Sequence, residues 1–111
     1  LHMPSHIFTR LGLWQESIES NIASAASAVE LVQKLHPGAG SFDQLHAMDY
    51  LEYAYLQTGQ DEKAKQVLEE MNTITKLDQN EFAAAYIVHL GYAPSPCQSD
   101  FLISFFLFYL F

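Results

Sequence analysis

The stretch YLQTGQDEKA, residues 55–64, decides the fold, because an apolar pattern stops within it and resumes at once. Gly59 suits the left-handed conformation that commonly ends a helix. Asp61 is a good N-cap residue for a second helix. Apolar residues then recur at helical spacing at Ala64, Val67, Leu68 and Met71. The stretch predicts a tight turn between two helices, and so short a connection makes them antiparallel neighbours.

The region before this turn also has a helical pattern. Ser41 and Gln44 match a capping box, in which each side chain satisfies a free backbone amide of the other residue. The apolar stripe that follows comprises Leu45, Met48, Leu51 and Tyr55. We therefore expect a helix pair over about residues 42–75.

An earlier segment, TRLGLWQES at residues 9–17, repeats the arrangement of helix, glycine and helix. Its glycine is Gly12, and the pattern restarts at Trp14. The predicted core stripe of the second helix is Trp14, Ile18, Asn21, Ile22, Ala25, Val29, Val32 and Leu35. Pro37 and Gly38 end this helix after about Lys34. A first pair is thus expected over about residues 5–35, and a partial third unit from about residue 79.

These patterns predict an all-α protein of antiparallel helix-turn-helix pairs. We expect a helical domain over residues 1–92, then a proline-containing turn and an apolar tail over residues 93–111. The tail, Phe101–Phe111, is too short to span a bilayer as a helix. It is interpreted as a cap on the last helix pair, as an artefact of the reading frame, or as an anchor to a membrane or partner.

Composition restricts the classes of function. Thirteen acidic against five basic residues give a net charge of −8 over 111 residues. Such a surface repels phosphate backbones and anionic membranes, so nucleic-acid binding and membrane binding are not expected. A single cysteine, Cys97, forms no internal disulfide, and residues 1–15 lack the pattern of a signal peptide. We therefore expect a cytoplasmic location.

The histidines raise the question of a metal. His2 and His6 are four apart, the spacing of two ligands on one helix face. Pro4 lies between them and is expected to begin the helix, which leaves His2 outside it. Histidines at positions 36, 46 and 89 are further possible ligands. We favour histidines that cap, stack or face solvent, and so predict no metal and no cofactor.

Another cluster joins acids, an imidazole and a phenol on one helix: His46, Asp49, Tyr50 and Glu52. Such groups perform acid–base chemistry when they line a pocket. The favoured interpretation is an exposed or groove-facing side of the helix.

Among the aromatic residues, Trp14 is expected in the core. Three tyrosines cover more than one face of the helix that contains His46, so at least one is expected to face outward: Tyr50, Tyr53 and Tyr55.

The two glycine-centred units, aligned on Gly12 and Gly59, resemble the tetratricopeptide repeat, a helix pair that stacks into a superhelix. In LHAMDYLEYAYLQTGQDEKAKQVLEEM, the positions at or near the family's packing sites are Leu51, Ala54, Tyr55, Gly59, Ala64 and Leu68. More narrowly, HMPSHIFTRLGLWQESIESN and HAMDYLEYAYLQTGQDEKA look like a group of largely uncharacterised bacterial proteins of this family. The resemblance covers about residues 1–86.

This resemblance implies a binding scaffold, in which a protein or peptide lies in the groove made by the first helix of each pair. The predicted groove residues are His6, Arg10, His46, Asp49, Tyr50 and Tyr53. The net acidity predicts a neutral or basic partner, and self-association is a further possibility. Two alternatives stay open. One is a metal-binding or hydrolytic site built from the histidine, aspartate and tyrosine groups; the other is a fragment of a larger solenoid without independent activity.

Overall fold

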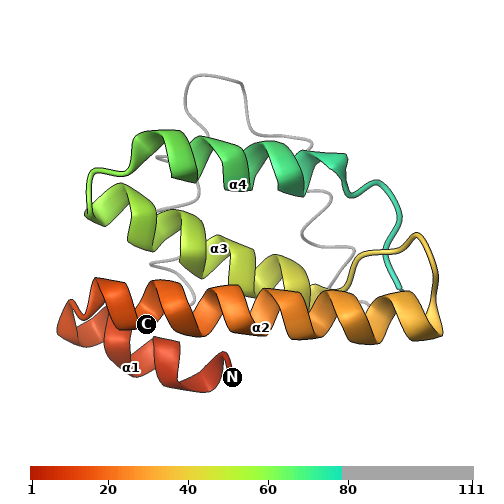
Figure 1. The fold of residues 1–111 in the computed structure, drawn as a ribbon, viewed down its shortest axis with the longest axis horizontal. Coiled ribbons are helices and arrows are strands. Elements are labelled where there is room, and N and C mark those ends of the chain that lie inside the picture. Colours follow the sequence, from red (N-terminus) through yellow and green to blue (C-terminus); the bar gives the residue numbers. More distant parts are fainter. Residues whose placement is uncertain (79–111) are drawn as a thin grey trace.

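The computed structural model describes residues 1–78, and this part of the chain is all-helical. Its helices are α1 (Met3–Leu11), α2 (Trp14–Leu35), α3 (Phe42–Gln57) and α4 (Asp61–Thr73). Successive helices run in opposite directions, and α3 lies between α2 and α4 (Figure 1). The prediction of an all-α fold is confirmed. The predicted unit from residue 79 and the tail at 93–111 lie outside the described residues.

Two glycine turns make the chain reverse direction, as predicted. Gly12 has φ +71° and Gly59 has φ +70°, both in the left-handed region. The amide of Gly12 donates to the carbonyls of Phe8 and Thr9, which closes the end of α1. At the second turn the Gln60 amide donates to the Tyr55 carbonyl at 2.8 Å. Glycine adopts this conformation without the strain that a Cβ atom would add.

The caps of α3 and α4 differ from each other. Ser41 caps α3 as predicted, because its hydroxyl accepts the Gln44 amide at 3.2 Å. The predicted cap at Asp61 is wrong: Gln60 is the N-cap residue of α4 and makes no side-chain cap bond. Asp61 is instead the first residue of α4, where its charge favours the positive end of the helix dipole. The same helix ends at Thr73, slightly before the expected boundary.

The core is centred on α3, which packs against both α2 and α4. The buried apolar residues of this core are Ile18, Leu45, Met48, Leu51, Ala54, Tyr55, Ala64, Val67 and Met71. Trp14 packs against it but is only half-buried. Because α3 is covered on several sides, it also buries polar residues, including Gln44, Asp49 and Glu52.

The predicted core stripe of α2 is partly wrong. Ile22 is 48% exposed and Leu35 is 64% exposed, whereas small polar residues of the same helix are buried. The small polar residues are buried because α1 packs against their side of α2. The Thr9 and Ser17 hydroxyls are hydrogen-bonded to each other at 3.2 Å. Short side chains let the two helices approach, and their hydroxyls satisfy each other.

A short contact ties the loop after α2 to the segment after α4. The Gly40 amide donates to the Lys76 carbonyl at 2.7 Å, and the Asp78 amide donates to the Gly40 carbonyl at 2.9 Å. Together they form an isolated parallel bridge between Gly40 and Leu77. This contact closes the end of the bundle opposite the Gly59 turn (Figure 1). Within residues 1–78, no helix combines the length and apolarity that spanning a bilayer requires.

Candidate functional site

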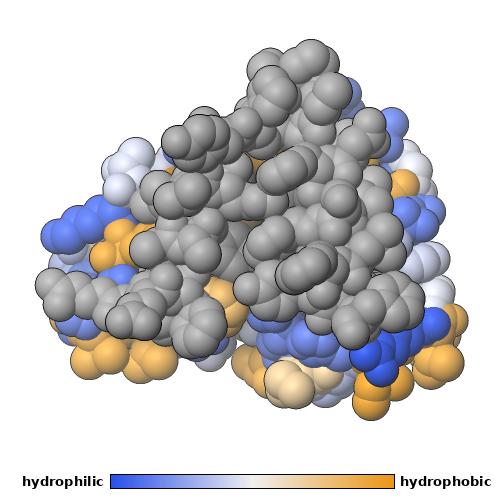
Figure 2. Space-filling model, turned by 180° about the vertical axis from the view of Figure 1, so that it is seen from behind, coloured by the Kyte–Doolittle hydropathy of each residue, from blue (hydrophilic) through white to orange (hydrophobic). Residues whose placement is uncertain are grey.

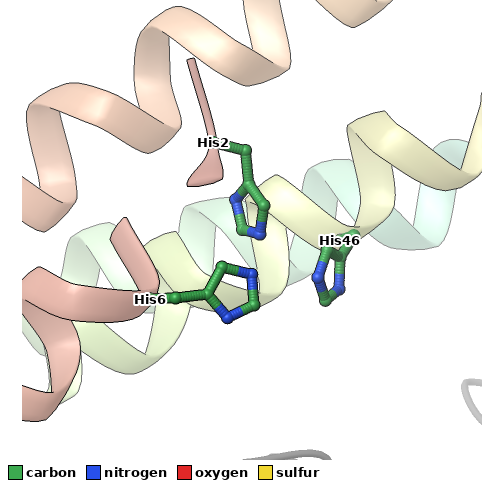
Figure 3. Close-up of side chains that lie close together, drawn as sticks. All are labelled: His2, His6 and His46. Carbon is green, nitrogen blue, oxygen red and sulfur yellow. The ribbon is translucent and has the colours of Figure 1, made fainter. Parts of the chain in front are cut away.

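Three histidine side chains converge where the N-terminal segment and α1 meet α3. His2 is the N-cap residue of α1, His6 lies one turn further on, and His46 belongs to α3. One ring nitrogen from each lies within 4.8 Å of the other two. Figure 3 shows the three imidazoles pointing toward one another from these separate segments. We call these three residues the histidine cluster.

Two polar residues of α2 hold the N-terminal segment in place. The Ser20 hydroxyl donates to the Leu1 carbonyl. The next residue of α2, Asn21, is fully buried, and its Oδ1 lies 2.7 Å from His2 Nδ1. The Asn21 amide group is itself oriented, because its Nδ2 donates to the Ser17 carbonyl at 2.8 Å. These hydrogen bonds hold the His2 ring within the histidine cluster, although His2 precedes the first helical residue of α1.

The other two histidines are positioned by aromatic neighbours. His6 Nδ1 lies 2.7 Å from the Tyr50 hydroxyl oxygen. The His46 ring stacks on Phe42, with ring centroids 5.3 Å apart and an interplanar angle of 14°. His2 contacts both other imidazoles edge to face, at centroid distances of 4.7 Å from His6 and 4.6 Å from His46. The site is thus a compact group of rings contributed by two helices and the segment before them.

Burial keeps these rings uncharged. Desolvation, and then the neighbouring His2 and His6, lower the pKa of His46 to about 4. Desolvation also lowers the pKa of His2 and of His6 below the ordinary imidazole value. Burial, followed by the charge of Asp49, raises the pKa of Tyr50 to about 12. Near neutral pH the group therefore consists of neutral imidazoles and a protonated phenol.

The carboxyl groups of Asp49 and Glu52 on α3 are buried, which corrects the interpretation that these two acids lie on an exposed side of the helix. Asp49 is 4% exposed and Glu52 is 3% exposed. Desolvation, and then the charge of Asp49, raise the pKa of Glu52 to about 8. The two acids are three residues apart on α3, so they share one side of the helix.

The predicted groove residues fall into separate environments. His6, His46 and Tyr50 come together, but Asp49 is not part of the histidine cluster. Arg10 is exposed on α1. Tyr53 is half-buried and meets Trp14 edge to face at 5.8 Å between centroids. The remaining member of the cluster is His2, which the sequence analysis considers as a possible metal ligand but not as a groove residue.

The tyrosines of α3 are more buried than expected. Tyr50 is 3% exposed and Tyr55 is 8% exposed, while Tyr53 is half-buried. Of the three, Tyr53 is the one that reaches the surface, so the prediction that at least one faces outward is met only in part.

The surface of the described residues includes one hollow over α3 and another beside the histidine cluster. The larger, of about 590 Å³, lies over α3 between α2 and α4. It is lined by Ile22, Ala25, Ala26, Val29, Gln44, Met48, Leu51, Tyr55, Lys63, Gln66, Val67 and Glu70. We call it the α2–α4 hollow. The smaller, of about 330 Å³, adjoins the histidine cluster and includes His2, His46 and Asp43 in its lining.

Comparison of the chain with protein-family models, with curated proteins and with solved structures finds no match. Membership of the tetratricopeptide-repeat family stays a prediction from the sequence. Any function assigned to the chain therefore depends on the geometry of the described residues.

Proposed function

We propose that this chain is a helical scaffold that binds a peptide segment of a protein partner in the α2–α4 hollow. We also propose that it is a repeat protein of the tetratricopeptide type, like the bacterial group that it resembles, and that it acts in the cytoplasm. The observation that carries the binding proposal is the hollow itself, whose apolar lining from α2 is exposed or partly exposed.

That lining has the pattern of a buried surface without being fully covered. Ile22, Ala25 and Val29 recur at helical spacing on α2, yet Ile22 is 48% exposed. Met48 and Leu51 of α3 form the floor beneath them. Fully burying one side chain of this size contributes about 1.5–3 kcal/mol. Binding of a partner that inserts a few apolar side chains here is therefore favourable, because these side chains are removed from water.

Charge indicates the kind of peptide. The chain carries thirteen acidic and five basic residues, and Glu70 lies at the edge of the hollow. Lys63 also lines the hollow, and its Nζ lies 5.5 Å from the centre of the Tyr55 ring, a cation–π contact. The matching partner is a segment with apolar anchors flanked by lysine or arginine, because complementary charge speeds association and selects partners.

Selection of short random peptides displayed on phage tests this proposal with the full chain. We expect enriched peptides with apolar anchors and basic flanks. The Ile22→Gln variant should weaken their binding by about tenfold, since about 1.4 kcal/mol of lost burial changes Kd tenfold. Leu35→Gln is the matched control, because Leu35 is an exposed apolar residue of the same helix outside the hollow. Failure to enrich any sequence, or equal binding by wild type and Ile22→Gln, would contradict the proposal.

A further inference from the structure

The buried Nε2 atom of His2 is the first indication of a ligand-binding site. Asn21 Nδ2 donates to Ser17, so its Oδ1 faces His2 and acts only as an acceptor. His2 Nδ1 must then carry the proton, and His2 Nε2 carries a lone pair. This Nε2 is buried and has no hydrogen-bond partner among the described residues. An unsatisfied buried polar atom in a native structure calls for an explanation.

The other histidines can direct lone pairs to the same place. When His6 Nδ1–H donates to the Tyr50 oxygen, 2.7 Å away, its Nε2 is left as an acceptor. His46 is held against Phe42 on the third side. A metal-binding histidine almost always donates its second ring N–H to a carbonyl, carboxylate or water, which fixes its tautomer. Asn21 Oδ1 accepts this hydrogen bond from His2, and the Tyr50 oxygen is placed to accept it from His6.

We propose that His2, His6 and His46 bind one divalent transition-metal ion, for which Zn²⁺ is the best match. Three neutral nitrogen ligands suit Zn²⁺ and its neighbours, whereas Mg²⁺ and Ca²⁺ prefer oxygen. Tetrahedral Zn–N bonds of about 2.0–2.1 Å place ligand nitrogens roughly 3.4 Å apart. Binding therefore draws the rings together from their present spread of up to 4.8 Å.

The fourth coordination position opens toward the smaller hollow. That hollow, of about 330 Å³, reaches both His2 and His46. Three protein ligands with an open fourth position are the arrangement of catalytic rather than structural zinc sites. The position accepts water or another small ligand, and the hollow provides the path by which the ion enters.

The test is calorimetric titration of the full, chelator-treated chain with Zn²⁺ alone, together with visible absorption of Co²⁺ in the same site. We expect one ion per chain, micromolar or tighter affinity, and the absorption bands of low-symmetry, four-coordinate Co²⁺. His46→Phe keeps the ring stack on Phe42 but removes a ligand, and should weaken binding more than about 100-fold. Asn21→Leu should weaken it about 10–100-fold, the usual cost of losing an outer-shell partner.

His36→Ala is the matched control, because His36 is exposed at the end of α2 and lies outside the cluster. Its affinity for Zn²⁺ should equal that of the wild type. Circular dichroism checks that each variant is folded. If His46→Phe fails to fold, imidazole NMR signals of the wild type replace it: Zn²⁺ should shift those of His2, His6 and His46 but not those of His36. Absence of binding at micromolar protein, or binding that persists in folded His46→Phe, would overturn the proposal. This site shares no residue with the α2–α4 hollow, so either can fail alone.

Discussion

Glu52 carries the carboxyl group whose ionisation acts against folding. It is 3% exposed, its Oε2 has no hydrogen-bond partner among the described residues, and the charge of Asp49 adds to the cost of burial. Its pKa rises from an ordinary 4.5 to about 8. Between those values the folded chain holds a proton that the unfolded chain has released. Stability from this group is therefore complete below about pH 4.5 and is lost as pH rises toward about 8.

Replacing Glu52 with Gln removes this penalty while keeping the shape of the side chain. We expect the variant to be about 1–3 kcal/mol more stable than wild type near pH 8, with little difference near pH 4.5, because an uncompensated buried charge is lost. Urea denaturation across this pH range measures the effect. Glu69→Gln, on the exposed side of α4, is the control and should change the free energy of unfolding by less than about 0.5 kcal/mol. Equal pH dependence in wild type and Glu52→Gln would show that the carboxyl group is ionised in the folded chain.

The histidine cluster shows how far single residues can be placed from sequence. His6, His46 and Tyr50 were predicted on first helices facing one groove, and they do meet. His2 was correctly placed outside the helix, but that position does not remove it from the site. Its location depends on hydrogen bonds to Ser20 and Asn21 of α2. In the sequence, Ser20 has the position of a surface residue and Asn21 that of a core residue of a long helix. No local pattern marks either residue as a partner of the N-terminal segment.

The helices and their turns were predictable, because the signals that define them are local. Each turn has a residue in the left-handed conformation, which favours glycine at positions 12 and 59. Ser41 caps α3 by accepting the amide of Gln44, only three residues further on. Which side of a helix is buried was harder to predict, because it depends on the helices that pack against it. The stripe of α2 that includes Ile22 was expected in the core. Ile18 and Val32 of this stripe are buried, but Ile22 borders an open hollow, and the neighbouring small polar side is covered by α1.

Gly40 has a role that depends on contacts between elements. A Cβ atom built on it would lie 2.4 Å from Ile74 Cγ2, just beyond the end of α4. Real contacts of this kind are not so short, so either the Ile74 side chain or the bridge from the α2–α3 loop to the last segment must shift. We expect Gly40→Ala to lower the free energy of unfolding by about 1–3 kcal/mol, the usual cost of overpacking.

A double-mutant cycle separates this steric cause from backbone strain. Ile74→Ala removes the clashing methyl group, so Gly40→Ala should cost at least about 1 kcal/mol less in that background. Gly38→Ala is the control: Gly38 has φ +81°, and a Cβ atom added to it would meet nothing within 4 Å, so its cost comes from the backbone alone. That cost should be the same with Ile74 or Ala at position 74. Simple additivity for the Gly40 pair would contradict the steric explanation.

At the scale of the molecule, the exposed large apolar side chains of residues 1–78 lie on α1 and α2 and on the residues directly before these helices. Met3, Ile7 and Leu11 are 72%, 61% and 67% exposed, and their spacing of four places them on one side of α1. From behind, apolar surface is visible along the lower rim, the side of the molecule on which α1 and α2 lie (Figure 2). In helical repeat proteins such a face is covered by an adjacent unit. A second copy of this chain offers a similar apolar face.

We therefore expect the full chain to self-associate through the exposed apolar side of α1, and we expect Ile7→Gln to shift the equilibrium toward monomer. The side chain is mostly exposed, so the substitution should change the free energy of unfolding by less than about 0.5 kcal/mol. Leu45→Ala, at a position with 0% exposure, should instead cost about 2–5 kcal/mol. Sedimentation velocity over a range of concentrations measures association, with Leu35→Gln as a control for loss of an exposed leucine outside this side of α1. A wild-type chain that stays monomeric at every concentration, or an Ile7→Gln variant that associates as strongly as wild type, would mean that this face does not bind a second copy.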